Sequence, residues 1–333
     1  FARHRQLDQA LIFTATKGRT IPGWRQWRYL HKFYNPQEIL ATKIALFLGL
    51  LALIVLGANL YKTRIQAGPA VGGEYVEAVV GAPNYINPLF SQTNGVDQDL
   101  AKLIFSGLVK FNGPGQIVPD LAESWSIDPA QTTYTFILRP GLAWHDGEPL
   151  TAGDVVFTIQ SLKDRNFKSP LYATFRSVAV KLVDQRTLSL TLSEPFAPFL
   201  SLLTFGILPQ HLWQVIEPSH ALLAELNLKP IGSGPYQFAS FAKDKKGNIL
   251  EYRLARFDRY HASGPFINYI NFKFFTTLDE AATAVTSGNA DGLGLVAGNI
   301  SQELAASDGW STYQLGWPQY TALFFDQGAN QGL

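Results

Sequence analysis

The sequence predicts a mixed α/β domain outside the membrane, preceded by one membrane-spanning helix. Residues 44–61, IALFLGLLALIVLGANLY, carry no charged side chain and are bracketed by Lys43 and Lys62. From residue 74 onward, short apolar runs alternate between the two-residue period of strands and the 3.6-residue period of helices. No internal repeat or low-complexity tract interrupts this second part.

Composition sets the first limits on function. The chain has 333 residues, enough for two or more domains, and a net charge of +1, which provides no overall field to attract nucleic acid. It contains no cysteine, so neither a disulfide nor a cysteine-linked lipid is expected. Because the sequence begins with Phe1 and stops at Leu333 just after an apolar run, we expect a fragment that lacks its first residues and part of its C-terminal region.

Residues 44–61 have the length of a membrane span. At about 1.5 Å rise per residue, a helix of this length covers roughly 27 Å, close to the thickness of the hydrocarbon core. A buried core helix would need apolar neighbours on every side. A signal peptide cleaved near Ala67 would usually have a shorter apolar region and a shorter segment before it. We therefore favour a retained membrane anchor over these two alternatives.

The distribution of basic residues predicts the orientation of this helix. Residues 1–43 carry eight basic and two acidic side chains, whereas only Lys62 and Arg64 follow the helix before Lys102. The positive-inside rule then places residues 1–43 in the cytosol and the remainder of the chain outside. Residues 62–73 are expected to be a linker.

The exported part alternates predicted strands and helices. Strands are predicted at 74–80, 108–111, 133–139, 178–183, 187–192, 236–241, 249–257, 266–275, 313–315 and 320–325, and helices at 97–105, 196–205, 209–215, 278–287 and 300–307. Residues 82–95, APNYINPLFSQTNG, read as a long loop rich in Pro, Asn and Ser.

The sequence HDGE at 145–148 has the residue types of a catalytic or metal site, but its surroundings favour a structural turn. The Asp-Gly pair within it is typical of a turn. Thr151 and Asp154 form a capping box that starts the next helix. His145 and Glu148 lack a third partner, because the sequence has no HExxH motif and no paired-histidine spacing. We interpret the motif as structural.

Other enzymatic motifs are also missing from the sequence. The stretch GSGPY at 232–236 is not a nucleophile elbow, because it lacks the Gly-x-Ser-x-Gly pattern and precedes a strand. There is no P-loop, and no Gly-x-Gly-x-x-Gly follows a strand. We therefore expect no catalytic residue, cofactor or metal ligand.

Eight stretches, taken in order, resemble the bacterial extracytoplasmic solute-binding proteins of family 5, the substrate-binding components of oligopeptide, dipeptide and nickel ABC importers. They are NPLF at 87–90, LIFSGLVKF at 103–111, IVPDLAESW at 117–125, YTFILRPGLAWHDGEPLTAGDVVFTI at 134–159, EPFAPFL at 194–200, GILPQHLW at 206–213, IGSGPYQF at 231–238 and SGNADG at 287–292. Each stretch is weak alone, and their order and spacing make the resemblance specific.

The resemblance implies a periplasmic-binding-protein-like fold, in which two lobes close over a ligand and an extra sub-domain is attached to the first lobe. On this pattern, residues 74–115 and 228–326 would form lobe I, and residues 116–227 the inserted sub-domain. Residues 327–333 would begin lobe II, which is otherwise missing from the sequence. The family is normally lipidated or free in the periplasm, so the apolar helix is a departure from its pattern.

The resemblance also implies a binding mode and site residues. A protein that accepts many peptide sequences hydrogen-bonds the extended backbone and leaves wet pockets for side chains. In the family, the loop after the first strand contacts the ligand, which here implies Gln92, Thr93, Asn94 and Gly95, with Gly95 allowing close backbone approach. Tyr172 matches an aromatic residue that overhangs the ligand in some members. A plain surface loop is the alternative at these positions.

The implied function is a membrane-anchored, extracytoplasmic protein that captures oligopeptides or dipeptides and delivers them to the permease subunits of an ABC importer. Nickel chelates and sugars are alternative ligands. A ligand-sensing receptor with the same fold and an exported hydrolase are alternatives of other classes. The basic tail shows no recognisable signalling domain and the sequence shows no catalytic constellation, so import is the preferred interpretation.

Overall fold

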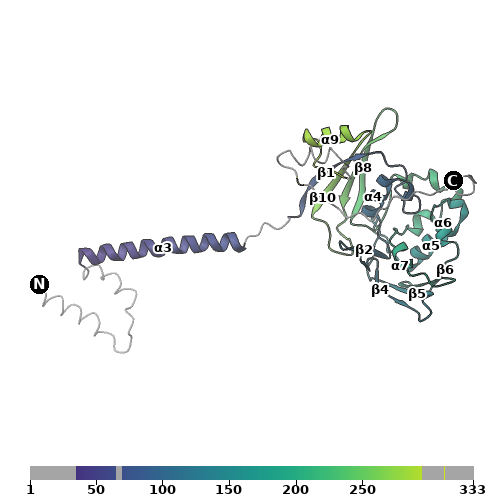
Figure 1. The fold of residues 1–333 in the computed structure, drawn as a ribbon, viewed down its shortest axis with the longest axis horizontal. Helices are drawn as coiled ribbons and strands as arrows, with labels where there is room; N and C mark the ends of the chain where they lie inside the picture. The colour runs from purple at the N-terminus through teal and green to yellow at the C-terminus, as the bar shows by residue number, and fades with distance from the viewer. Residues whose placement is uncertain (1–34, 65–69, 295–310, 312–333) are drawn as a thin grey trace, which may run out of the picture. The chain divides into compact units, whose positions relative to one another are not determined.

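The computed structural model describes residues 35–64, 70–294 and 311, and the chain divides into two units, Phe1–Ala70 and Val71–Leu333. The described part of the first unit is the single helix α3. The second unit holds the strands and the other helices that the structure describes (Figure 1).

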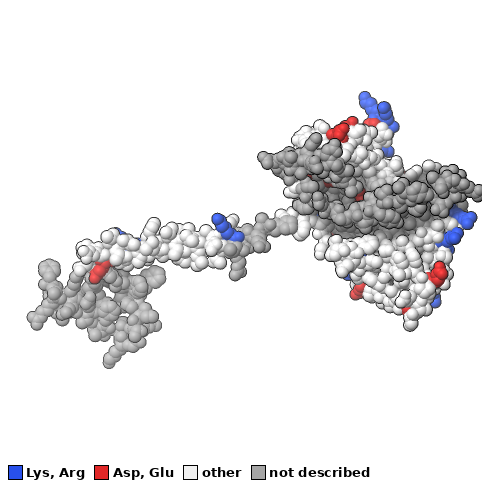
Figure 2. All heavy atoms as spheres, in the orientation of Figure 1, with Lys and Arg blue, Asp and Glu red and all other residues white. Residues whose placement is uncertain are grey.

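Helix α3, Pro36–Arg64, is longer than the predicted span at both ends. Its window Pro36–Lys62 is long and apolar enough to cross a membrane, with a mean hydropathy of 2.6 and none of it buried in the protein. Proline suits the first helical position, because its missing N–H needs no partner there. Figure 2 shows charged atoms mainly toward the two ends of the helix. The predicted linker is correspondingly shorter, because α3 continues to Arg64 and the first strand begins at Gly72.

The larger sheet has five strands in the order β11-β1-β10-β9-β8. They span Gly292–Leu293 (β11), Gly72–Val80 (β1), Ile267–Phe275 (β10), Ile249–Arg256 (β9) and Tyr236–Lys243 (β8). Strand β1 is parallel to β10 and β11, whereas β9 pairs antiparallel with β10 and with β8. Helix α9, Leu278–Thr286, connects β10 to β11 and packs Ala281 and Ala284 against Ala78 of β1.

A second, antiparallel sheet has four strands in the order β4-β5-β7-β6. They span Ala122–Ile127 (β4), Thr133–Leu138 (β5), Thr187–Thr191 (β7) and Ala179–Leu182 (β6). Helix α5, Ala152–Lys163, contacts strands β6 and β7. The hairpin of β2, Val109–Phe111, and β3, Ile117–Pro119, precedes this sheet in the chain.

Short helical segments complete the fold between these elements. They are α4 (Gly95–Ile104), α6 (Tyr172–Phe175), α7 (Phe199–Leu202), α8 (Gln210–Trp213), and the 3-10 turns η2 (Ser91–Thr93), η3 (Arg165–Phe167), η4 (Pro218–Leu223) and η5 (Glu225–Asn227).

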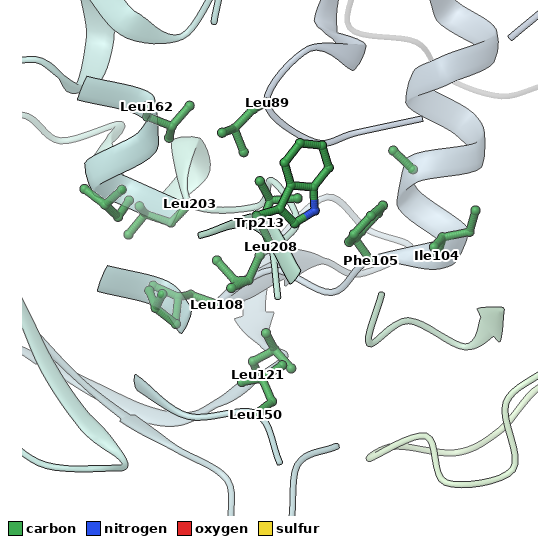
Figure 3. Packing of buried hydrophobic residues seen from close by; sticks show 14 of the residues in the cluster. Leu89, Ile104, Phe105, Leu108, Leu121, Leu150, Leu162, Leu203, Leu208 and Trp213 are labelled. Atoms are coloured by element: carbon green, nitrogen blue, oxygen red, sulfur yellow. The ribbon is translucent and has the colours of Figure 1, made fainter. Parts of the chain in front are cut away.

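One hydrophobic core joins the two sheets. Its buried members include Tyr252 and Leu254 from β9 as well as Phe136 and Leu188 from β5 and β7. Figure 3 shows Trp213 in this core among Leu89, Phe105 and Leu208. The four-stranded sheet lies between β1 and β8 in the chain. Because the side chains of both sheets share one core, we expect the sheets to unfold together.

Most predicted elements agree with the described ones. The predicted hairpin of 178–183 and 187–192 is confirmed by β6 and β7, and the capping box at Thr151 is confirmed at the start of α5. The predicted helix at 196–205 is wrong in length, because α7 begins only after Pro198 and ends at Leu202. The elements predicted at 300–307, 313–315 and 320–325, and the start of lobe II at 327–333, lie outside the described residues.

Candidate functional site

The HDGE motif forms a turn whose histidine is held by the backbone. The N–H of Gly147 donates to the carbonyl of Trp144 at 3.0 Å, and Gly147 has a φ of 96°, the left-handed conformation that favours glycine. The turn expected from the sequence is therefore confirmed. Next to it, the carboxylate of Asp146 lies 2.8 Å from Nε2 of His211.

His145 makes three contacts with one segment. Its Nδ1 accepts the N–H of Gly232 at 3.1 Å, and its backbone N–H donates to the carbonyl of Gly232 at 2.9 Å. An acceptor at Nδ1 leaves the proton on Nε2, which lies 3.1 Å from the carbonyl of Gly234. Burial lowers the pKa of His145 to about 4, although the hydrogen bond to Gly234 opposes this shift. The ring is neutral at physiological pH and both nitrogens are used, so it serves structure.

The stretch IGSGPY also packs by backbone contact. A Cβ at Gly232 would lie 2.0 Å from the carbonyl oxygen of Ile104, and one at Gly234 would lie 2.5 Å from that of Leu103. The N–H of Gly234 donates to the carbonyl of Ile104 at 2.8 Å. Both glycines are therefore required to seat this segment on the last turn of α4.

The predicted ligand loop, residues 82–95, is fixed by two buried polar side chains. The carboxylate of Asp97 accepts the backbone N–H groups of Asn84 at 2.7 Å and Tyr85 at 2.9 Å. The buried side chain of Asn87 accepts from the N–H of Leu89 and donates to Oδ1 of Asn227. A polar loop held at these points presents its tip in a defined conformation.

The structure separates the four predicted loop residues by role. Asn94 caps α4, because its Oδ1 accepts the N–H of Val96 at 3.0 Å and its Nδ2 donates to the carbonyl of Ala82 at 3.0 Å. Gly95 is the first residue of that helix, and nothing lies within 4 Å of where its Cβ would be. The protein itself makes no close backbone approach at Gly95. Gln92 and Thr93 are exposed on the preceding 3-10 turn.

Gln92 lines a pocket of about 220 Å³. The walls come from the loop, from one face of α4, from Leu171 just before α6, and from α7 with the segment after it. They are Pro88, Ser91, Gln92, Gln98, Ala101, Lys102, Phe105, Leu171, Ser201, Leu202, Thr204, Phe205 and Gly206. Thr93, Asn94 and Gly95 are not among them.

Tyr172 lies beside this pocket and does not line it. Its hydroxyl accepts from Nε of Arg165 at 2.8 Å, and the guanidinium of Arg165 lies 5.4 Å from the centre of its ring. The preceding residue, Leu171, does line the pocket. Arg165 thus holds the tyrosine outside the pocket lining.

Sequence reasoning missed the pocket walls beyond Gln92. From the sequence, Lys102 and Phe105 were predicted only as residues of the helix at 97–105, without a role in a pocket. Thr204 and Phe205 fell inside a predicted helix that ends earlier. Phe205 is held at a ring-centre distance of 5.3 Å from Phe175 in an edge-to-face contact. No local pattern identifies such a pocket, because its walls are far apart in the chain.

Comparisons with known proteins identify the family. The family described as "Bacterial extracellular solute-binding proteins, family 5 Middle" matches residues 116–329. The chain belongs to this family. Its members are extracellular solute-binding proteins rather than enzymes, and solved members share the mixed α/β periplasmic-binding-protein fold.

Three relatives illustrate the range of the family. The "Dipeptide-binding protein" of Escherichia coli (strain K12) is 32% identical over 218 residues, which cover 58% of this chain and 39% of that protein. The structure of AppA from Bacillus subtilis in complex with a nonapeptide has a TM-score of 0.63 and 25% identity, over 67% of this chain and 44% of that one. NikZ from Campylobacter jejuni in complex with Ni(L-His) has a TM-score of 0.59 and 27% identity, over 65% and 42%. The chain spans less than half of each of these three proteins.

Proposed function

We propose that this protein captures short peptides outside the cytoplasmic membrane and delivers them to the permease subunits of an ABC importer. Family membership supports solute capture. Peptides are favoured as the solute because the E. coli relative is named for dipeptides and the B. subtilis relative is seen with a nonapeptide.

The anchored loop with Gln92 at its tip is the observation that carries this proposal. Asp97 and Asn87 hold the loop by hydrogen bonds to its backbone, so little conformational entropy is lost when a ligand arrives. The side chains of Gln92 and Thr93 are exposed at the turn, and Gln92 also lines the pocket. An amide and a hydroxyl can both donate to and accept from a peptide backbone without reading its side chains.

Helix α3 is the proposed anchor. Its apolar window is not buried within the part of the chain that the structure describes, and a bilayer would cover it. The basic excess of residues 1–43 supports an orientation with that segment in the cytosol and the solute-binding unit outside. Tethering would keep the binding protein within reach of its permease.

A thermal-shift assay on the full-length protein tests the proposal. Pools of di-, tri- and longer peptides are compared with free amino acids and with sugars. A ligand at about 100 times its Kd adds about 2.7 kcal/mol to the free energy of unfolding, which raises the melting temperature by several degrees. A rise with peptides alone supports the proposal. No rise with any peptide contradicts it.

A nickel chelate is the second candidate ligand, because NikZ was seen with Ni(L-His). No group of three or more His, Cys, Asp or Glu side chains suited to a metal ion exists among the described residues. At a site made only of the described residues, a chelate would have to bring its own ligands to the metal. Ni(L-His) belongs in the same assay, and a rise with it but not with peptides would favour this alternative.

A further inference from the structure

The pocket beside Gln92 has a distinctive chemistry. Lys102 is the one charged residue among those that line it. The buried lining holds one polar residue, Ser91, beside an apolar floor formed by Pro88, Ala101 and Phe105. We propose that this pocket binds a carboxylate-bearing part of the ligand, with the ammonium of Lys102 facing the carboxylate and the apolar floor receiving the carbons next to it. This inference rests on the proposed function and names one subsite within it.

Position on α4 directs Lys102 to the pocket. Gln98 lies three and four residues before Ala101 and Lys102, and the C-cap Phe105 lies four and three residues after them, so all four lie on one side of the helix. Lys102 is in the last turn and is exposed. The ion pairs of the described residues use other cations, such as Lys110 with Asp120 and Lys229 with Glu225. Among the described residues no carboxylate pairs with the ammonium of Lys102, which leaves it able to meet an anion at the pocket.

Asp99, three residues before Lys102 on α4, interacts electrostatically with that lysine. Partial burial raises the pKa of Asp99, and the positive charge of Lys102 opposes that rise. Asp99 does not line the pocket. The lysine is thus partly balanced by its own helix and keeps its three donors for a ligand.

Three other polar side chains of the lining are already oriented by hydrogen bonds. Nε2 of Gln98 donates to the carbonyl of Gln92 at 3.0 Å, which fixes the turn against the helix. The hydroxyls of Ser201 and Thr204 donate to the carbonyls of Pro198 at 2.6 Å and Ser201 at 3.0 Å. With their protons engaged, these hydroxyls offer only lone pairs to the pocket, so the positive charge at Lys102 is what favours an anion there.

Volume limits the ligand group. A pocket of about 220 Å³ is roughly seven times the volume share of one liquid water, about 30 Å³. It therefore suits a group of several carbon atoms with its carboxylate rather than a single small ion. In a peptide, that group is either the C-terminal residue with its free carboxylate or an acidic side chain.

Two pairs of probe peptides distinguish these sources in equilibrium binding to the full-length protein. The first pair is Ala-Ala-Phe as free acid and as amide. The second pair is Ala-Glu-Ala and Ala-Gln-Ala, both amidated. In one pair the carboxylate form should bind more tightly, and Lys102→Gln should reduce that ratio about tenfold, the effect of one charge-assisted hydrogen bond. Which pair responds tells which carboxylate enters the pocket.

Two further variants make the test specific. Lys102→Arg should preserve the ratio, because it keeps the charge. Lys181→Gln removes an exposed lysine that does not line the pocket and should also preserve it. All three variants should melt within about two degrees of the unaltered protein, since the changed side chains are exposed.

The outcomes separate the inference from the function on which it rests. Ratios that are unchanged by Lys102→Gln in both pairs overturn the carboxylate subsite and leave peptide capture standing. Failure of every peptide to bind the unaltered protein contradicts peptide capture, and the subsite is then rejected with it.

Discussion

Nδ1 of His145 accepts the backbone N–H of Gly232 at 3.1 Å, across 87 residues of sequence. This contact ties the turn before α5 to the segment that leads into β8. The neutral imidazole of His145 bonds to backbone groups of the distant segment. The HDGE motif, whose residue types suggest a catalytic site, thus links the regions of the two sheets. The stability of that junction can be measured, because the imidazole has a lowered pKa.

Acid should weaken the native state through His145. Burial lowers its pKa from 6.5 to about 4 in the folded protein, so between these values the unfolded chain binds a proton that the native state does not. The free energy of unfolding should be unaffected by this group above pH 6.5 and should fall as the pH drops toward 4, by about 3 kcal/mol in total. Urea unfolding at a series of pH values measures this loss.

The contribution of His145 is isolated by substitution. His145→Gln should flatten the pH dependence between 6.5 and 4 relative to the unaltered protein, since an amide does not titrate there. His220→Gln, which removes an exposed histidine of η4, should leave the dependence in place. Equal slopes for both variants would show that folding does not lower the pKa of His145.

Gly232→Ala should be strongly destabilising. The new Cβ would lie 2.0 Å from the carbonyl oxygen of Ile104, so the segment must move and its hydrogen bonds with His145 must stretch. A loss of about 3 kcal/mol in the free energy of unfolding is expected from overpacking of this kind. Gly264→Ala is the control, because nothing lies within 4 Å of its Cβ position. Similar chemical-unfolding midpoints for the two variants would contradict the close packing described for Gly232.

We expect Asn94 and Gln92 to have different roles, Asn94 in stability and Gln92 in ligand binding. Asn94→Ala removes the cap of α4 and should lower the free energy of unfolding by about 1 kcal/mol. Gln92→Ala removes an exposed amide whose side chain has no hydrogen bond recorded within the described residues, so stability should change by less than about 0.5 kcal/mol. Peptide affinity should fall in Gln92→Ala. Unchanged affinity in that variant would remove Gln92 from the site.

Membrane retention should depend on α3. The double variant Leu51→Arg and Val55→Arg places two charges one turn apart in the apolar stretch, at a cost of about 3 kcal/mol each for insertion. The fraction of full-length protein that resists alkaline extraction from membranes should fall sharply. Val215→Arg, at a side chain 80% exposed in the second unit, is the control and should be retained. Full retention of the double variant would argue against α3 as the anchor.

Local patterns predicted most of the elements, because their causes are local. The capping box at Thr151, the turn at Gly147 and the alternation in β5 each depend on a few neighbouring residues. The sequence also predicted that the HDGE motif is structural and not catalytic, because His145 and Glu148 lack a third partner. It could not name Gly232 as the partner of His145, because that contact depends on the packing of distant segments.

The candidate site was predictable only in part, for the same reason. The family resemblance pointed to the loop that carries Gln92. The opposite wall, with Thr204 and Phe205, was assigned to a helix, since apolar spacing continued beyond the point at which α7 ends. Nothing in the sequence singled out Lys102 as a pocket residue, because a single lysine on a helix is usually exposed to solvent.

Isothermal titration calorimetry tests the central claim most directly. The full-length protein is titrated with a peptide from the pool that raises its melting temperature. Peptide capture predicts saturable binding of one peptide per chain, with affinity reduced in Gln92→Ala and preserved in the distant variant Lys181→Gln. Absence of heat and of any thermal shift with every peptide, in a protein that unfolds cooperatively, would contradict the claim and turn the search to nickel chelates and sugars.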